Sequence, residues 1–171
     1  MSRVIVFFVT GDDTHPSSRY RGRMFAESLA EVGYKTYVIY SPTPSHSWNV
    51  HNVFRFLKEF LAGLILKICR FVQLRGADLF YVQRGFFAGL PGKANLLTSV
   101  LDIIFFCLST LVLRKKIIFD YDDALYITSP LKTRLFLSRS NAVVAAGHRL
   151  TEFAMKYNRY VRIVPMSIRL E

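Results

Sequence analysis

The sequence VIVFFVTGDDTHPSS at residues 4–18 decides the fold. Its first six residues are all apolar, which is typical of a strand buried on both faces of a parallel sheet. The run has no basic leader and no small-residue cleavage site, so we interpret residues 3–9 as a first buried strand and not as a secretory signal. The polar residues after it form a loop that leads into a helix, which Ser17 and Ser18 can cap.

Apolar strands and helical patterns alternate along the rest of the chain. Further strands are expected at residues 35–40, 77–83, 116–120, 141–146 and 161–164. Helices are expected at residues 17–32 (ended by Gly33), 52–74, 95–113, 131–137 and 148–157. This alternation, without an internal repeat or linker, predicts one α/β domain with a doubly wound parallel sheet, Rossmann-like and three-layered. The domain is expected to span residues 1–169, and Leu170-Glu171 can be a cloning scar.

The composition is that of a basic protein with enough apolar residues for a sizeable core. Its 171 residues are 51% hydrophobic and 20% charged, which excludes disorder throughout. Lys and Arg number 23 against 12 Asp and Glu, a net charge of +11. A field of that sign attracts nucleic acid, anionic lipid headgroups or phosphorylated small molecules. Because no nucleic-acid recognition motif is present, nucleic acid is not an expected partner.

The two cysteines, Cys69 and Cys107, lie in strongly apolar segments. This pattern predicts free buried thiols in a reducing cytosol and disfavours a disulfide framework or a zinc site. Residues 96–113 carry Asp102 as their only charge, but their length is marginal for a bilayer span. Since a span would remove one helix from the alternation, we expect a buried helix that covers the sheet.

The predicted helix at residues 52–74 has a narrow polar stripe and is apolar over the rest of its circumference. A surface helix of a soluble α/β protein normally exposes a wider polar face. Excess apolar surface beside basic residues suits contact with an anionic membrane surface, and equally suits cover by neighbouring elements or by a part of the protein outside this sequence. The residues predicted to meet the membrane are Arg55, Lys58, Phe60, Lys67 and Arg70.

The loop after the first strand is a candidate binding site, because ligands of open parallel sheets bind beyond the carboxyl ends of the strands. It lacks GxGxxG, which argues against a nicotinamide or flavin dehydrogenase. Its arginines crowd the first turns of the next helix against the helix dipole, which favours a bound anion such as a phosphate. The candidates are Ser18, Arg19 and Arg21, with His15 as an acid/base or an ordinary loop residue.

A cation follows the third strand and three acids follow the fourth. Arg84 either binds an anion or pairs with a nearby acid such as Asp12 or Asp13. Asp120, Asp122 and Asp123 lie so close in sequence that at least one is expected to have a raised pKa, unless arginine or a metal compensates. One of them can act as a general base or bind sugar hydroxyls. The alternatives are a weak D-x-D metal motif, or capping of the next turn by one acid while another pairs with arginine.

Four stretches of the chain, residues 4–40, 77–87, 115–126 and 141–168, resemble in order the N-terminal domain of family-four (group 1) glycosyltransferases of the GT-B fold. The most specific parts are SSRYR at the start of the first helix, the DYDDA turn, and the last strand with its proline. The resemblance implies a retaining glycosyltransferase with no cofactor and no metal. Such enzymes bind a nucleotide-sugar donor mainly in a C-terminal domain, which lies outside this sequence, and a glycosyl acceptor in this one.

The resemblance also assigns residues. It places Gly11 and Asp12 in the loop near the donor diphosphate and the acceptor, and the turn at 120–123 where many members carry a functional histidine. The candidate catalytic residues are therefore Asp120, Asp122 and Asp123. The chain departs from the family in lacking a second glycine in the first loop and in carrying acids in place of the histidine.

The family works on lipid-linked or polysaccharide acceptors, often at the cytoplasmic face of the cell membrane, so a cytoplasmic, peripheral location is expected. This half alone is expected to be inactive. The chief rival is a non-enzymatic Rossmann-like module that binds a phosphorylated ligand or an anionic membrane. A third reading is a metal-dependent GT-A enzyme that uses Asp120 and Asp122. No Ser-His-Asp elbow, Walker loop, HExxH or paired CxxC is present in the sequence.

Overall fold

The computed structural model describes residues 3–11, 15–41, 65, 68–87 and 94–165. Within them lies one parallel sheet of six strands in the order β2-β1-β3-β4-β5-β6. The strands are β1 (Val4–Thr10), β2 (Lys35–Ser41), β3 (Leu79–Gln83), β4 (Lys116–Tyr121), β5 (Ala142–Ala145) and β6 (Val161–Ile163). The predicted single α/β domain with a doubly wound parallel sheet is confirmed.

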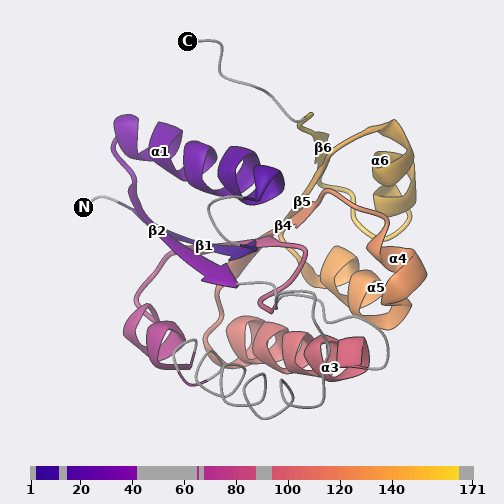
Figure 1. The fold of residues 1–171 in the computed structure, drawn as a ribbon, viewed down its shortest axis with the longest axis horizontal. Coiled ribbons are helices and arrows are strands. Elements are labelled where there is room, and N and C mark those ends of the chain that lie inside the picture. The colour runs from indigo at the N-terminus through magenta and orange to yellow at the C-terminus, as the bar shows by residue number, and fades with distance from the viewer. Residues whose placement is uncertain (1–2, 12–14, 42–64, 66–67, 88–93, 166–171) are drawn as a thin grey trace, which may run out of the picture.

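Helices connect the strands and cover both faces of the sheet. They are η1 (Ser18–Arg23, π-helical), α1 (Met24–Glu31), α3 (Ala94–Cys107), η2 (Leu108–Val112, π-helical), α4 (Leu125–Thr128), α5 (Pro130–Arg139) and α6 (His148–Met155). α1 lies on one face, and α3, α5 and α6 lie on the other (Figure 1). The short α4 is an element that the sequence pattern did not predict.

The two faces of the sheet have separate cores, because successive side chains of a strand point to opposite sides. On the α1 side, Phe7 and Tyr81 pack with Ala26 of the helix. On the other side, Phe8 and Phe119 belong to a larger cluster with residues of α3, α5 and α6. The unbroken apolar run of β1 is thus explained by burial on both faces, as the sequence predicted.

The start of the first helix differs from the prediction. Ser17 already has helical backbone angles and makes no capping hydrogen bond, and the Ser18 hydroxyl donates to the carbonyl of Thr10. Both serines therefore tie the helix to the sheet and do not cap it. The predicted stop at Gly33 is confirmed: this residue has φ of 95°, and its amide donates to the carbonyl of Ala30.

The prediction that both cysteines are free is confirmed, but the prediction that both are buried is wrong for Cys69 and only partly met by Cys107. Both thiols are free, but Cys69 is exposed and Cys107 is half-buried. Cys69 lies on the helical segment 68–73, which presents most of its side chains outward. Within the described ranges, no helix is long and apolar enough to cross a bilayer. Residues 52–64, 66 and 67 of the predicted amphipathic helix lie outside the described residues.

Candidate functional site

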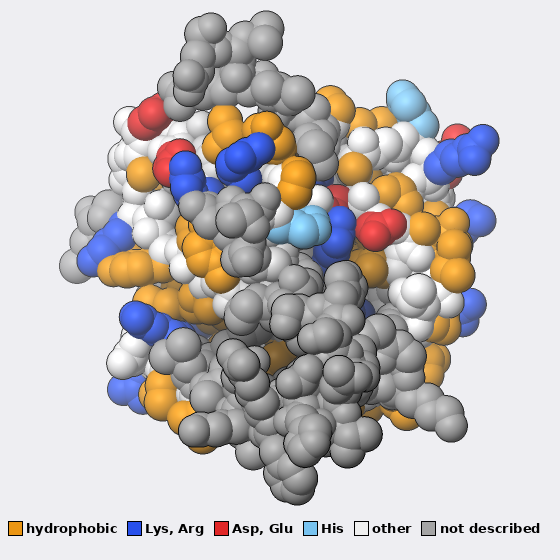
Figure 2. All heavy atoms as spheres, in the orientation of Figure 1, with side chains coloured by type: hydrophobic (Ala, Val, Ile, Leu, Met, Phe, Trp, Pro, Cys, Tyr) orange, Lys and Arg blue, Asp and Glu red, His pale blue; other side chains and the backbone are white. Residues whose placement is uncertain are grey.

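The carboxyl ends of β1, β3 and β4 bring most of the predicted site residues together. β1 lies between β2 and β3, so the strand order reverses between β1 and β3, which is where open α/β sheets bind ligands. The Thr10 hydroxyl donates to the carbonyl of Gln83 (3.1 Å) and joins the two strand ends. Near the middle of the face shown in Figure 2, a histidine lies among basic and acidic side chains.

Gly11 allows the chain to turn closely over the start of the helix. Its φ is 97°, and its amide donates to the carbonyl of Ser41 (2.7 Å). A Cβ at this position would lie 2.9 Å from Ser18 Oγ and 3.0 Å from the Cβ of His15. Because both the backbone angle and the space exclude a side chain, glycine is required here for local structural reasons.

Arg21 and Asp120 form a buried ion pair that joins the first helix to the tip of β4. Arg21 Nε donates to both carboxylate oxygens of Asp120 (2.8 and 3.1 Å), and Nη2 donates to Oδ1. Arg21 Nη1 donates to the carbonyl of Val164 (2.8 Å). Since every nitrogen of the guanidinium is engaged, we interpret Arg21 as a framework residue that fixes Asp120.

Burial raises the pKa of Asp120 from 3.8 to about 6, although the Arg21 guanidinium pulls it down. The sequence predicts a raised pKa within this acid cluster, and this is what the structure gives. The predicted cause was repulsion between the carboxylates, whereas the main cause is loss of solvent, and Asp122 adds a smaller contribution.

This raised pKa predicts an unusual pH dependence of stability. Between pH 4 and pH 6 the folded chain holds a proton on Asp120 that the unfolded chain has released, so the contribution of this group is largest below pH 4. It is lost as the pH rises through about 6, by at most about 1.4 kcal/mol per pH unit. Urea unfolding at pH 4, 5, 6 and 7 should show the loss in wild type relative to Asp120→Asn. Parallel pH profiles for the two proteins would contradict the assignment.

Arg84 is the cation of this region that remains open to solvent. Its side chain is 25% exposed, and its Nε donates to Asp122 Oδ1 (2.8 Å). Its Nη2 lies 3.4 Å from Ser17 Oγ and 4.0 Å from Asp123 Oδ2. The residue has φ of 61°, a sparsely populated conformation for a non-glycine residue. Arg84 therefore pairs with an acid, as one alternative predicted, but its partner is Asp122, whereas the predicted acids, Asp12 and Asp13, lie outside the described residues.

Gln83 organises the space between Arg84 and the first helix. Its side chain is fully buried, and its Nε2 donates to the carbonyl of Ser17 and to Asp122 Oδ2, both at 3.2 Å. Among the described residues, its buried Oε1 has no hydrogen-bond partner, and the same holds for Nδ1 of His15. Unpartnered polar atoms of this kind are rare in native proteins, and a ligand is one way to satisfy them.

We name these residues, Gly11, His15, Ser17, Gln83, Arg84 and Asp122, the switch-point cluster. Ser17 and Gln83 were not among the predicted site residues. The signal for Gln83 was present, as a polar residue that ends the otherwise apolar strand LFYVQ at residues 79–83. Ser17 takes part through its backbone carbonyl and its hydroxyl, and only the fold brings these opposite β3.

Three further predicted residues are not counted in this cluster, although Asp123 and Ser18 lie next to members of it. Arg19 points to Tyr20: Nη2 donates to the Tyr20 hydroxyl (3.1 Å), and the guanidinium lies over the ring. The carboxylate of Asp123 is 60% exposed and accepts the amide of Ala124 at 2.7 Å. The N-cap of α4 is Ala124 and has no side-chain capping hydrogen bond, so the predicted cap by an acid is not formed. Ser18 is fully buried.

Several predicted residues lie outside the described residues: Asp12, Arg55, Lys58, Phe60 and Lys67. Arg70, the remaining predicted membrane contact, is exposed. Among the described residues, no group of three or more His, Cys, Asp and Glu is arranged to hold a metal ion. The two carboxylates of the D-x-D motif, Asp120 and Asp122, are each paired with an arginine.

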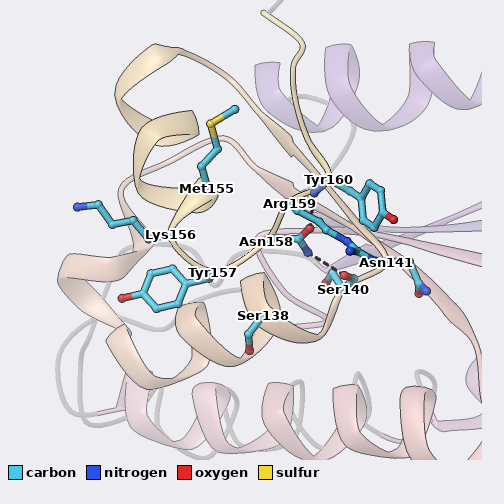
Figure 3. Close-up of a pocket in the computed structure, with 9 residues that line it drawn as sticks. All are labelled: Ser138, Ser140, Asn141, Met155, Lys156, Tyr157, Asn158, Arg159 and Tyr160. Carbon is cyan, nitrogen blue, oxygen red and sulfur yellow. Dashed lines mark hydrogen bonds between the residues drawn. The ribbon is translucent and has the colours of Figure 1, made fainter.

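A hollow lies away from the switch-point cluster, between the ends of α5 and α6 and the turn into β6 (Figure 3). Its volume is about 600 Å³, and Ser140, Asn158 and Arg159 are among its lining residues. Asn158 Nδ2 donates to the carbonyls of Leu137 and Ser140 (both 2.8 Å), which closes the end of α5. Because none of the predicted site residues lines it, we assign this hollow to the framework.

Comparison of the sequence with protein-family models and with curated proteins finds no match. The glycosyltransferase hypothesis therefore depends on the sequence stretches quoted above and on the geometry of the switch-point cluster.

Proposed function

We propose that this chain is the acceptor-binding half of a retaining GT-B glycosyltransferase. The enzyme would transfer a sugar from a nucleotide-sugar donor to a lipid-linked or polysaccharide acceptor at the cytoplasmic face of the membrane. Two lines support the proposal. The sequence resembles the family's N-terminal domain at four ordered stretches, and the parallel sheet is of the kind that such a domain requires.

The observation that carries the proposal is the chemistry of the switch-point cluster. The partly exposed guanidinium of Arg84 and the buried amide of Gln83 both bond to Asp122. Gln83 Oε1 and, next to Gly11, His15 Nδ1 are buried and have no hydrogen-bond partner among the described residues. A sugar phosphate offers both an anion for the guanidinium and hydroxyl groups that donate to buried acceptors. The cluster thus matches a glycosyl ligand better than it matches an apolar one.

The three predicted catalytic acids take different parts in this proposal. Asp120 and Asp122 are held by Arg21 and Arg84 and shape the site. Asp123 is the most solvent-exposed of the three, and its Oδ2 is 4.0 Å from Arg84 Nη2. We assign contact with acceptor hydroxyls to Asp123.

A titration with glucose 1-phosphate, followed by amide NMR shifts of the chain, tests the proposal. We expect shifts at Gly11, Arg84 and Gly85, and weakening by about tenfold or more in Arg84→Lys, because lysine cannot form the bidentate contact. Arg149→Lys, an exposed cation on α6, is the matched control and should bind as wild type does. Shifts confined to residues outside the cluster, or equal affinity of both variants, would contradict the proposal.

Two observations distinguish the proposed enzyme from the alternative, a non-enzymatic module for phosphorylated ligands. Inorganic phosphate that shifts the same amides as strongly as glucose 1-phosphate favours the module, since no sugar is then read. A reading frame that continues into a second domain with an E-x7-E pair favours the enzyme.

A further inference from the structure

The outer side of α3 and η2 exposes a continuous row of large apolar side chains. Leu111 is 71% exposed, and the others expose between 40% and 72%. Spacings of three and four residues place them on one side of the helix. We call this row the α3 apolar face: Leu96, Leu97, Val100, Ile104, Leu108, Leu111 and Val112.

The core of the domain does not account for this face. The opposite side of the same helix already supplies Phe105 and Phe106 to the buried cluster against the sheet. The helical segment 68–73 packs against α3 through Phe71, whose ring centroid lies 5.3 Å from that of Phe105. This segment adds exposed Ile68 and Val72. Apolar surface of this extent on a soluble domain marks an interaction site.

Basic residues gather at one end of the α3 apolar face. Lys115 Nζ donates to the carbonyl of Ala77 (2.7 Å), so the turn that follows η2 lies against the turn that precedes β3. Exposed Arg75 and Arg114 belong to these two turns, and exposed Lys116 is the first residue of β4.

One exposed carboxylate, that of Asp78, lies in the turn that precedes β3 and accepts the Val4 amide (2.7 Å), so it offsets only part of this charge. Asp102, the acid of α3, points inward and is buried against Lys132 Nζ (2.9 Å). The described residues of α3, η2 and the turn at 113–115 contain no exposed carboxylate.

We propose that the α3 apolar face docks on an anionic lipid bilayer, with the basic turns against the headgroups. A helix that lies in the interface buries its apolar side at the level of the acyl boundary, and each nearby cation is attracted by the negative surface potential. The inference rests on the membrane association in the proposed function, and it assigns that contact to α3 in addition to the predicted helix 52–74.

Charge selects lipid over a second copy of the chain. In a two-fold dimer the apolar rows of the two copies would cover each other, but the basic turns would find no acidic partner there, since the described residues of α3, η2 and the turn at 113–115 contain no exposed carboxylate. An anionic membrane instead complements both the apolar row and the basic end.

Co-sedimentation of the 171-residue chain with vesicles tests the inference. Wild type should bind vesicles of phosphatidylglycerol and phosphatidylcholine in low salt, and bind pure phosphatidylcholine at least tenfold more weakly. Leu111→Glu should lower binding to the anionic vesicles by about tenfold or more, because it places a charge in the apolar row. Val32→Glu is the matched control: Val32 is also 71% exposed, but it follows α1 on the other face of the sheet.

Each result decides between the alternatives. Equal loss in Leu111→Glu and Val32→Glu, or no binding by a wild-type chain whose circular dichroism shows it folded, overturns the inference. A concentration-dependent dimer that Leu111→Glu dissociates, with no vesicle binding, identifies a second copy as the occupant. Lys116→Glu, at the exposed start of β4, should weaken binding without a change in the apolar row. The vesicle assay contains no sugar phosphate, so a negative result in it leaves the proposed sugar-phosphate site at the switch-point cluster untouched.

Discussion

Replacing Arg21 by methionine is expected to lower the free energy of unfolding by about 3–5 kcal/mol. The substitution leaves the Asp120 carboxylate buried with no cation beside it, and it also removes the hydrogen bond to the carbonyl of Val164. Breaking one half of a buried pair costs more than the pair contributes, because the remaining charge has neither water nor a partner. Chemical unfolding at pH 7, followed by circular dichroism, measures the loss.

Arg23→Met is the control for this measurement. Arg23 lies two residues further along the chain, and its Nε is 3.1 Å from a carboxylate oxygen of Glu27, with both side chains well exposed to solvent. An exposed pair of this kind contributes less than about 1 kcal/mol. Similar losses in the two variants would show that the Arg21–Asp120 pair has no special structural role.

Replacing Asp102 by alanine is expected to destabilise the chain by a comparable amount, about 3–5 kcal/mol. The carboxylate accepts the amides of Phe86 (2.6 Å) and Phe87 (2.9 Å) and pairs with the buried Lys132. It also fills the space above Gly85, where a Cβ would lie 2.5 Å from Asp102 Oδ2. One side chain of α3 thus holds the loop directly after Arg84, so the variant should bind glucose 1-phosphate more weakly as well.

Two further variants separate the buried charge from the hydrogen bonds. Asp78→Ala removes an exposed carboxylate that accepts the Val4 amide (2.7 Å), and it should cost about 1 kcal/mol. The double variant Asp102→Ala with Lys132→Met removes both buried charges and should recover part of the loss. If the double variant is no more stable than Asp102→Ala, the penalty comes from the loop amides alone.

The inner strands β1, β3 and β4 were predictable because burial on both faces selects an almost continuous apolar run in the sequence. β1 is apolar from Val4 to Val9, since neighbours such as Phe7 and Phe8 enter different cores, and a polar residue marks the point where β3 ends. The candidate loops followed from the parallel sheet, because its strand tips meet at one edge.

The assignment of partners within the site was not predictable. Arg19 and Arg21 are two residues apart and look alike in sequence, but one lies over Tyr20 and the other reaches Asp120, 99 residues away. Likewise, Asp102 was visible as the only charge of its helix, whereas its pairing with Lys132 depends on how α3 packs beside α5. Contacts of this kind arise from tertiary packing and leave no local pattern.

The hydrogen bond from Arg21 to the carbonyl of Val164 couples the buried Asp120 to the backbone just after β6. The same guanidinium holds the acid at the tip of β4 and the backbone just after β6. Movement of that exit segment would withdraw an acceptor from a buried cation, and ionisation of Asp120 would in turn change how firmly the exit is held. The direction in which the polypeptide leaves the sheet and the proton affinity of a carboxylate beside the switch point are therefore thermodynamically linked, and each must respond to the other by the same free energy.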